Sequence, residues 1–144
     1  MNMNGVARDY RRLMIADDDP LARSMLSVSL SDSFKIVGVA PDAEAAIELA
    51  RTSQPHVALV DVEMPQGGGL SAVHGIVGVS PKTAIVVLSG DESDGMVRAL
   101  MQAGAVAYCR KGIPPQALIA CLVGSIHARA GERDRSYVAL GPVS

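Results

Sequence analysis

The chain has 144 residues, enough for one domain that buries a core without disulfides or a structural metal. Its 13 basic and 15 acidic side chains give a net charge of -2 with no extended basic block, which excludes sequence-independent binding of nucleic acid by this chain. No apolar run reaches the roughly 18 residues of a membrane span, and the polar opening lacks a signal-peptide core, so we expect a cytoplasmic protein that does not enter a membrane.

The apolar residues indicate the kind of core. Hydrophobic residues make up 49% of the chain and aromatic residues only 3%, which is typical of aliphatic helices packed on a parallel sheet. The two cysteines, Cys109 and Cys121, fall in apolar segments without metal-ligand spacing. We interpret them as reduced, inert packing residues in a reducing compartment.

After a loose leader at residues 1–12, the first predicted unit is a strand, an acidic turn and a helix. The strand covers residues 13–16, and three aspartates follow it. Proline at position 20, preceded by an aspartate, is a strong helix start, and the helix is expected to reach about Ser31. Its apolar residues recur at helical spacing: Leu21, Met25, Leu26 and Leu30.

The same alternation continues along the chain. The other predicted strands are residues 35–40, 56–61, 83–88 and 105–109. The other predicted helices open at Pro41-Asp42, follow a glycine loop at 66–69, stop at Gly104, and run from Pro114-Pro115 to Ile126. Residues 131–144 are polar and are interpreted as a tail or linker, which leaves one domain at 13–130.

Five strands that alternate with five helices predict a doubly wound parallel sheet with right-handed crossovers and helices on both faces. A flavodoxin-like strand order of 2-1-3-4-5 would bring the first and third strands together. Polar residues would then meet beyond the carboxyl ends of the strands. They are Asp17, Asp18, Asp61, Ser89 and Lys111.

By itself Asp61 is more simply explained as a cap of the next turn, but the combination of residues favours a site. Converging carboxylates repel each other, so the cluster should raise a pKa or recruit a cation. An all-oxygen site suits Mg²⁺. A carboxylate screened in this way can attack a phosphoryl group and form an acyl phosphate, with Lys111 and the Ser89 hydroxyl as donors to its oxygens.

Four motifs lie at the predicted strand ends: Asp17-Asp18, Asp61-x-x-Met64-Pro65 with Gly69 four residues on, Ser89-Gly90, and Tyr108-x-x-Lys111. Together they resemble the CheY-like receiver domain of two-component response regulators. The resemblance covers residues 13 to about 130. Two further stretches, 15–21 and 103–105, resemble the NarL/LuxR branch of the family.

This resemblance implies a role for each site residue. Asp61 would be the phosphoacceptor, Asp18 and Asp61 would bind Mg²⁺ directly, Asp17 would act through water, and the backbone carbonyl of Glu63 would be a further ligand. Two other roles are implied: Ser89 and Tyr108 would form the switch, and Lys111 would pair with the phosphate. Serine stands at 89 where threonine is more usual, and Gly112 stands where many receivers have proline.

The function implied is that of a switch rather than a turnover enzyme. A sensor histidine kinase would supply the phosphoryl group, and phosphorylation would alter the surface of the fourth helix, fifth strand and fifth helix. That surface would serve a homodimer or an output domain. Residues 131–144 are too few for a helix-turn-helix domain, so the chain is either a fragment of a longer regulator or works alone.

Other interpretations stay open from the residues. Lys111 alone would usually be solvated, Tyr108 could be an ordinary edge-strand residue, and Ser89 a helix-capping hydroxyl. One alternative function is a degenerate receiver that acts as a constitutive interaction module. Another is a phosphohydrolase of the haloacid-dehalogenase type, although position 63 is Glu rather than the Asp of that class. A dinucleotide-binding domain is disfavoured because no G-x-G-x-x-G follows the first strand.

Overall fold

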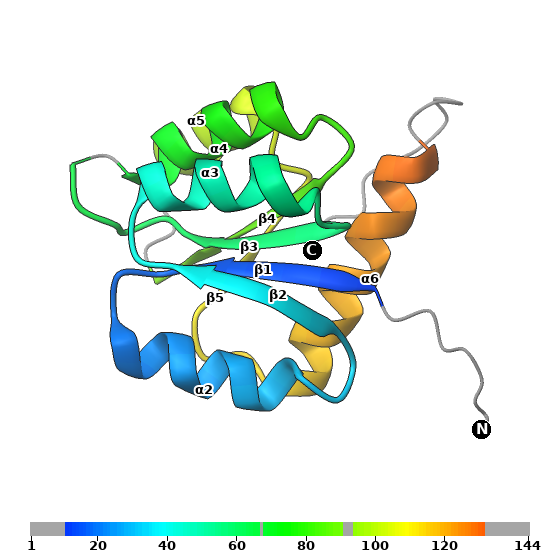
Figure 1. The fold of residues 1–144 in the computed structure, drawn as a ribbon. Helices are drawn as coiled ribbons and strands as arrows, with labels where there is room; N and C mark the ends of the chain where they lie inside the picture. Colours follow the sequence, from blue (N-terminus) through cyan, green and yellow to red (C-terminus); the bar gives the residue numbers. More distant parts are fainter. Residues whose placement is uncertain (1–10, 67, 91–93, 132–144) are drawn as a thin grey trace.

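The computed structural model describes residues 11–66, 68–90 and 94–131. Strands and helices alternate along these residues, as the apolar pattern predicts (Figure 1). In chain order the elements are β1 (Arg12–Ala16), α2 (Pro20–Leu30), β2 (Lys35–Ala40), α3 (Ala43–Ser53), β3 (Val57–Asp61), α4 (Gly68–Val79), β4 (Ala84–Ser89), α5 (Asp94–Ala103), β5 (Ala107–Arg110) and α6 (Pro115–Gly131).

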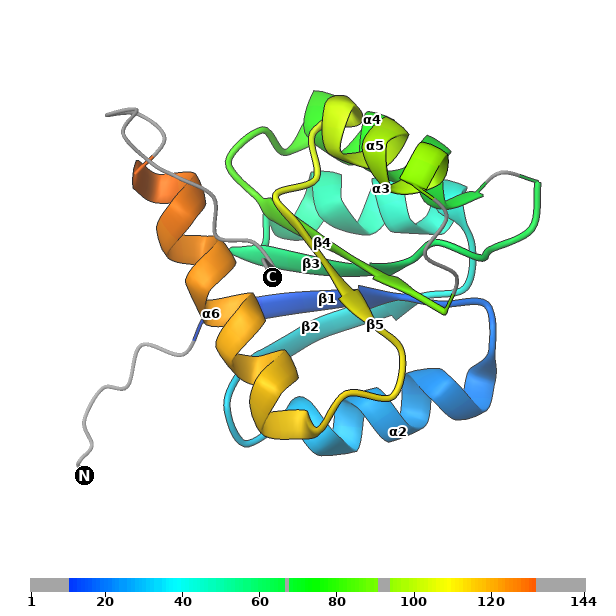
Figure 2. The same ribbon diagram turned by 180° about the vertical axis from the view of Figure 1, so that it is seen from behind.

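The five strands form one parallel sheet in the order β2-β1-β3-β4-β5. Helices α3, α4 and α5 cover one face, and α2 and α6 cover the other (Figures 1 and 2). This arrangement confirms the predicted doubly wound fold and its strand order. All five strands therefore end at the same edge of the sheet.

Two apolar cores fill the space between the sheet and its helices. On β3, Ala58 and Val60 belong to the core under α3, α4 and α5, whereas Val57 and Leu59 belong to the core over α2 and α6. Every residue of β3 is buried, including Asp61. A strand buried on both faces holds its terminal carboxylate in a fixed position at the edge of the sheet.

Helix α2 begins as predicted but packs less of its apolar surface than its spacing suggests. The Asp19 side chain accepts a hydrogen bond from the backbone N–H of Leu21 at 3.0 Å, so it is the N-cap of this helix. Leu30 is buried, but Leu21, Met25 and Val28 are 66%, 60% and 78% exposed. Helical spacing identifies the helix without showing which of its apolar residues reach a core.

The predicted glycine loop was wrong at two of its residues, because Gly68 and Gly69 open α4. A Cβ atom at position 69 would lie 2.5 Å from the backbone oxygen of Val62. Glycine is needed here because the first turn of α4 packs against the chain that leaves β3, and no side chain fits between them. Gly67 lies outside the described residues.

Other boundaries differ slightly from those predicted. β1 begins one residue earlier, at Arg12, and β5 spans Ala107–Arg110 rather than 105–109. Helix α6 reaches Gly131. The leader up to residue 10 and the tail from residue 132 lie outside the described residues, so the division of the chain stays a prediction. Among the described residues, no helix is both long and apolar enough to cross a bilayer.

The glycine contact gives a stability prediction with a matched control. We expect Gly69→Ala to lower the free energy of unfolding by about 1–3 kcal/mol, because the added methyl group would overlap the backbone of Val62. Gly78→Ala, in the same helix, meets no atom within 4 Å and should raise it by about 0.4–1 kcal/mol. Urea unfolding measures both. Equal effects of the two substitutions would contradict the proposed close approach.

Candidate functional site at the carboxyl edge of the sheet

The sheet's hydrogen bonding continues past the strand ends and fixes the backbone of the site residues. The N–H of Asp17 donates to the carbonyl of Ala40 at 3.0 Å, and the N–H of Lys111 donates to the carbonyl of Ser89 at 2.9 Å. The register places Asp61 opposite Leu88. Residues that are far apart in sequence are therefore held side by side by the parallel ladder.

Three carboxylates meet at this edge. One oxygen each from Asp17, Asp18 and Asp61 lies within 4.8 Å of the others. Asp17 and Asp61 are only 2% and 3% exposed, whereas Asp18 is exposed. Backbone N–H groups orient the buried pair: that of Asp19 donates to Asp17 Oδ1, and that of Glu63 donates to Asp61 Oδ1, each at 3.0 Å.

Lys111 reaches this cluster from the end of β5. Its Nζ atom lies 3.0 Å from Asp61 Oδ1 and 3.1 Å from Glu63 Oε1. Burial lowers the pKa of Lys111, but its hydrogen bonds to Asp61 and Glu63 outweigh that effect, and the net shift is upward. The ammonium is therefore charged and shared between two carboxylates.

The close approach of these negative charges affects the pKa of Asp17. Burial raises the pKa of its carboxyl group, and the negative charge of Asp61 raises it further, although the hydrogen bond from Asp19 opposes both. Two buried carboxylates beside an exposed third form an all-oxygen donor set. Such a set suits a hard divalent cation such as Mg²⁺, whose charge would relieve the repulsion.

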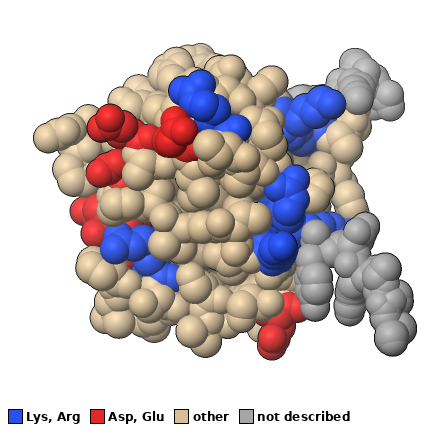
Figure 3. Space-filling model, in the orientation of Figure 1, with Lys and Arg blue, Asp and Glu red and all other residues tan. Residues whose placement is uncertain are grey.

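A cavity of about 500 Å³ opens at this cluster. Asp17, Asp18, Asp61, Glu63 and Lys111 all line it, and Ala22, Met25 and Leu26 of α2 form an apolar part of its wall. In Figure 3, acidic side chains gather toward the edge at which β1 and β2 end in Figure 1. The structure thus brings five of the predicted site residues together around one opening.

The two predicted switch residues lie near this cavity but do not line it. Ser89 is the last residue of β4 and is 2% exposed. Tyr108 is half-buried in β5 and packs against the core under α3, α4 and α5. Both positions are compatible with the predicted switch, and their role in it stays a prediction.

The apolar wall from α2 was not predicted from the sequence. Met25 and Leu26 recur at the spacing of core residues, and nothing in that spacing marks them as cavity residues. Gly112 also lines the cavity, with a φ of +93°. Proline cannot adopt that φ, so the backbone after Lys111 follows a path that a proline there would not permit.

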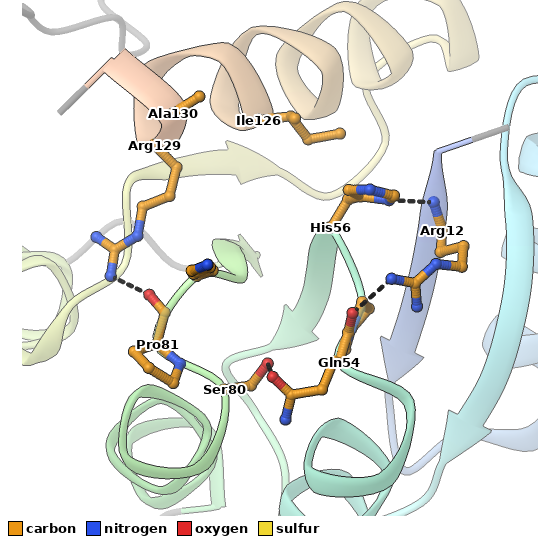
Figure 4. A pocket seen from close by; sticks show the side chains of 10 residues that line it. Arg12, Gln54, His56, Ser80, Pro81, Ile126, Arg129 and Ala130 are labelled. Atoms are coloured by element: carbon orange, nitrogen blue, oxygen red, sulfur yellow. Dashed lines mark hydrogen bonds between the residues drawn. The ribbon is translucent and has the colours of Figure 1, made fainter. Parts of the chain in front are cut away.

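A larger cavity, about 730 Å³, lies at the opposite edge of the sheet (Figure 4). Polar groups around it form hydrogen bonds that connect separate segments of the fold. The Arg12 guanidinium donates to the carbonyls of Ser53 and Gln54 at the end of α3, and Arg129 donates to the carbonyl of Pro81. His56 accepts from the backbone N–H of Arg12 at 2.9 Å. Size alone therefore does not identify the site, since the clustered carboxylates lie at the smaller cavity.

Comparison with known proteins decides the family. The family model of the response regulator receiver domain matches residues 13–123. The chain belongs to this family. It is a receiver domain, as the motifs at its strand ends predict, and the assignment does not favour the phosphohydrolase alternative.

Two response regulators are similar to this chain over most of its length. Response regulator GacA of Pseudomonas aeruginosa is 37% identical over 103 residues, which cover 70% of this chain and 48% of that protein. Response regulator UvrY of Escherichia coli is 32% identical over 112 residues, which cover 76% and 51%. The chain therefore spans about half the length of the curated relatives it matches.

Solved structures agree with this assignment. The receiver domain of response regulator NarL from Mycobacterium tuberculosis superposes with a TM-score of 0.78 at 26% identity, covering 83% of this chain and 98% of that one. A CheY-like receiver domain from Methanospirillum hungatei, at 20% identity, has a TM-score of 0.79 and covers 86% and 99%. The second similarity shows the fold alone. The first supports the resemblance to the NarL/LuxR branch.

The raised pKa of Asp17 predicts a pH dependence. Because folding raises this pKa above its ordinary value of 3.8, the folded protein binds the proton more tightly than the unfolded chain. Stability is therefore lost as pH rises from 3.8 through the folded-state pKa of Asp17. We expect Asp17→Asn to raise the urea midpoint at neutral pH without Mg²⁺, and the gain to vanish below 3.8.

Asp32→Asn provides the control for this experiment, because it removes an exposed aspartate outside the cluster. Its effect on the urea midpoint should be small and should not follow the same pH course. A destabilised Asp17→Asn protein at neutral pH would contradict the inference that burial and repulsion from Asp61 make a charged Asp17 unfavourable in the folded protein.

Proposed function

We propose that Asp61 is the phosphoacceptor of this receiver domain and that the domain works as a phosphorylation-controlled signalling switch. One observation carries the proposal: a buried carboxylate at a strand end lies 3.0 Å from the ammonium of Lys111, beside two further carboxylates. A carboxylate oxygen attacks the phosphorus of a donor, the bond from phosphorus to the donor breaks, and an acyl phosphate remains on Asp61.

The role of Lys111 in this reaction is to neutralise the negative charge on Asp61 before and after phosphoryl transfer. Before transfer its ammonium is bound to carboxylate oxygens of Asp61 and Glu63. Once Asp61 carries the phosphoryl group, the ammonium pairs with a phosphoryl oxygen, which bears the charge that the free carboxylate bore. Glu63 competes for the same ammonium, so it tunes how firmly Lys111 holds the phosphoryl group.

The acidic residues would hold Mg²⁺. Asp18 and Asp61 would bind the ion directly, Asp17 would act through water, and the backbone carbonyl of Glu63 would complete the protein's share. When bound, the ion supplies charge neutralisation between the carboxylates and the incoming phosphoryl oxygens. The chain's own contribution is to orient Asp17 and Asp61 through the backbone hydrogen bonds from Asp19 and Glu63.

Ser89 and Tyr108 would transmit the change. Ser89 ends the strand next to Asp61, so a small movement of the β4 end would bring its hydroxyl to a phosphoryl oxygen. Tyr108 would then turn inward behind it. The affected surface is that of α5, β5 and α6, and we propose that it serves a homodimer or an output domain in a longer chain.

Two alternatives are weaker on this geometry. In a phosphohydrolase of the haloacid-dehalogenase type, the second acid would be a general acid/base, but here the Glu63 carboxylate is bound to Lys111 at 3.1 Å. A degenerate receiver would lack part of the acceptor site, whereas Asp61, Lys111 and the aspartate pair are all in place. We therefore propose a switch that catalyses only its own phosphotransfer and dephosphorylation.

The outer face of α2 supports a protein phosphodonor. We propose that this donor is a sensor histidine kinase, which this protein meets in the cytoplasm. Leu21, Met25 and Val28 lie one helical turn apart, are more than half exposed, and form an apolar stripe. Met25 also lines the cavity that contains Asp61. A donor that delivers a phosphoryl group to Asp61 must cover this opening, and the stripe extends its contact surface.

Labelling by acetyl phosphate in the presence of Mg²⁺ tests the acceptor. We expect Asp61→Asn to abolish labelling on a phosphate-affinity gel, because an amide cannot form the acyl phosphate. Asp32→Asn, outside the cluster, should label like the wild type. Retained labelling of the Asp61→Asn protein would place the acceptor elsewhere.

A second experiment separates docking from chemistry. We expect Val28→Glu to slow phosphotransfer from a histidine kinase that labels the wild type by at least about tenfold, because a charge would have to be buried at the contact. Labelling by acetyl phosphate should be unchanged, since Val28 does not line the cavity. Equal loss with both donors would contradict a docking role for the stripe.

A further inference from the structure

The two cysteines lie against each other. Cys109 is in β5 and Cys121 is in α6, and their Sγ atoms lie 2.9 Å apart with both thiols free. This is closer than an ordinary van der Waals contact between two sulfur atoms. A disulfide bond is about 2.05 Å long, so the sulfur atoms need to approach by only ~0.9 Å to be joined.

The surroundings give the two thiols different accessibility. Both belong to the apolar core over α2 and α6, while the neighbouring Tyr108 packs on the opposite face of the sheet. Cys109 is buried, whereas Cys121 is half-buried and lies nearer to solvent. A small oxidant would therefore reach Cys121 first, with Cys109 directly behind it.

We propose that Cys109 and Cys121 form a reversible intramolecular disulfide when the protein meets a hydroperoxide. In a reducing compartment the pair rests as the dithiol and is oxidised transiently, which is the usual form of a cytosolic redox site. The inference does not depend on phosphorylation, because neither cysteine lines the acidic cavity. It replaces the view of these residues as inert packing.

The hydrogen bonding between the thiols favours one order of reaction. Cys109 S–H donates to Cys121 Sγ, and this bond is the main reason that the pKa of Cys121 is lowered, although burial opposes it and Ser125 assists. The same bond and burial raise the pKa of Cys109. Cys121 is thus the better nucleophile, and Cys109 is the resolving thiol.

The reaction balances with the hydroperoxide as the oxidant. Cys121 thiolate attacks one peroxide oxygen, the O–O bond breaks, and the other oxygen leaves with a proton as an alcohol, or as water from hydrogen peroxide. Cys121 is now a sulfenic acid. The sulfur of Cys109 attacks it, gives up its proton, and displaces hydroxide as water. The two thiols lose two electrons and two protons in total.

Hydrogen peroxide treatment of the reduced wild-type chain tests the proposal. We expect both thiols to be lost to iodoacetamide, the intact mass to fall by about 2 Da, and the protein to stay monomeric on a non-reducing gel, with full reversal by dithiothreitol. Arg110 and Lys111 lie between the cysteines, so trypsin separates them. A cross-linked pair of tryptic peptides would then identify the bond.

Single substitutions provide the controls. With only two cysteines in the chain, Cys109→Ala and Cys121→Ala should each abolish the mass loss, and Cys109→Ala should leave Cys121 to gain oxygen atoms instead. The wild-type measurement remains decisive if either variant fails to fold. Persistence of both wild-type thiols, oxygen addition without a cross-link, or a disulfide between two chains would overturn the inference.

Discussion

Buried carboxylates repel each other at the carboxyl edge of the sheet, and the geometry of the site follows from how that repulsion is offset. Asp17 and Asp61 are almost fully removed from solvent and share one small region with Asp18. Such charges persist only where the surroundings compensate them. Backbone N–H groups and the ammonium of Lys111 supply that compensation in part. A divalent cation and a phosphoryl group would change the balance again, which is how a local reaction can shift the packing of a whole domain.

The parallel sheet makes this crowding possible. Its hydrogen bonds run past the strand ends, so the backbones of Asp17 and Lys111 are as firmly placed as those of the strands. Gly69 lets the start of α4 pack against the backbone just beyond Asp61. Negative charge therefore accumulates at an edge where the parallel ladder and the start of α4 hold the backbone in place, an arrangement expected of a functional site rather than of a stabilising one.

Two features outside the acidic cluster extend this view. The apolar stripe on α2 runs from the wall of the cavity onto the outer surface, where it would give the proposed phosphodonor a place to bind beside Asp61. The thiols of Cys109 and Cys121 connect β5 to α6 on the face of the sheet opposite Tyr108. Phosphoryl chemistry and thiol chemistry would therefore act on the same strand from different sides.

Apolar periodicity is a local signal and was enough to predict the alternation of strands and helices, which in turn favours the flavodoxin-like strand order. The motif residues at the predicted strand ends indicated the site. These motifs predicted that Asp61 and Lys111 belong to the same site, and the structure places Lys111 Nζ 3.0 Å from Asp61 Oδ1. Three features could not be predicted from the chain: Gly68 and Gly69 belong to a helix, Leu21 and Met25 remain exposed, and Cys109 touches Cys121. These features depend on how closely separate elements approach one another, and that distance is set by packing in three dimensions rather than by spacing along the chain.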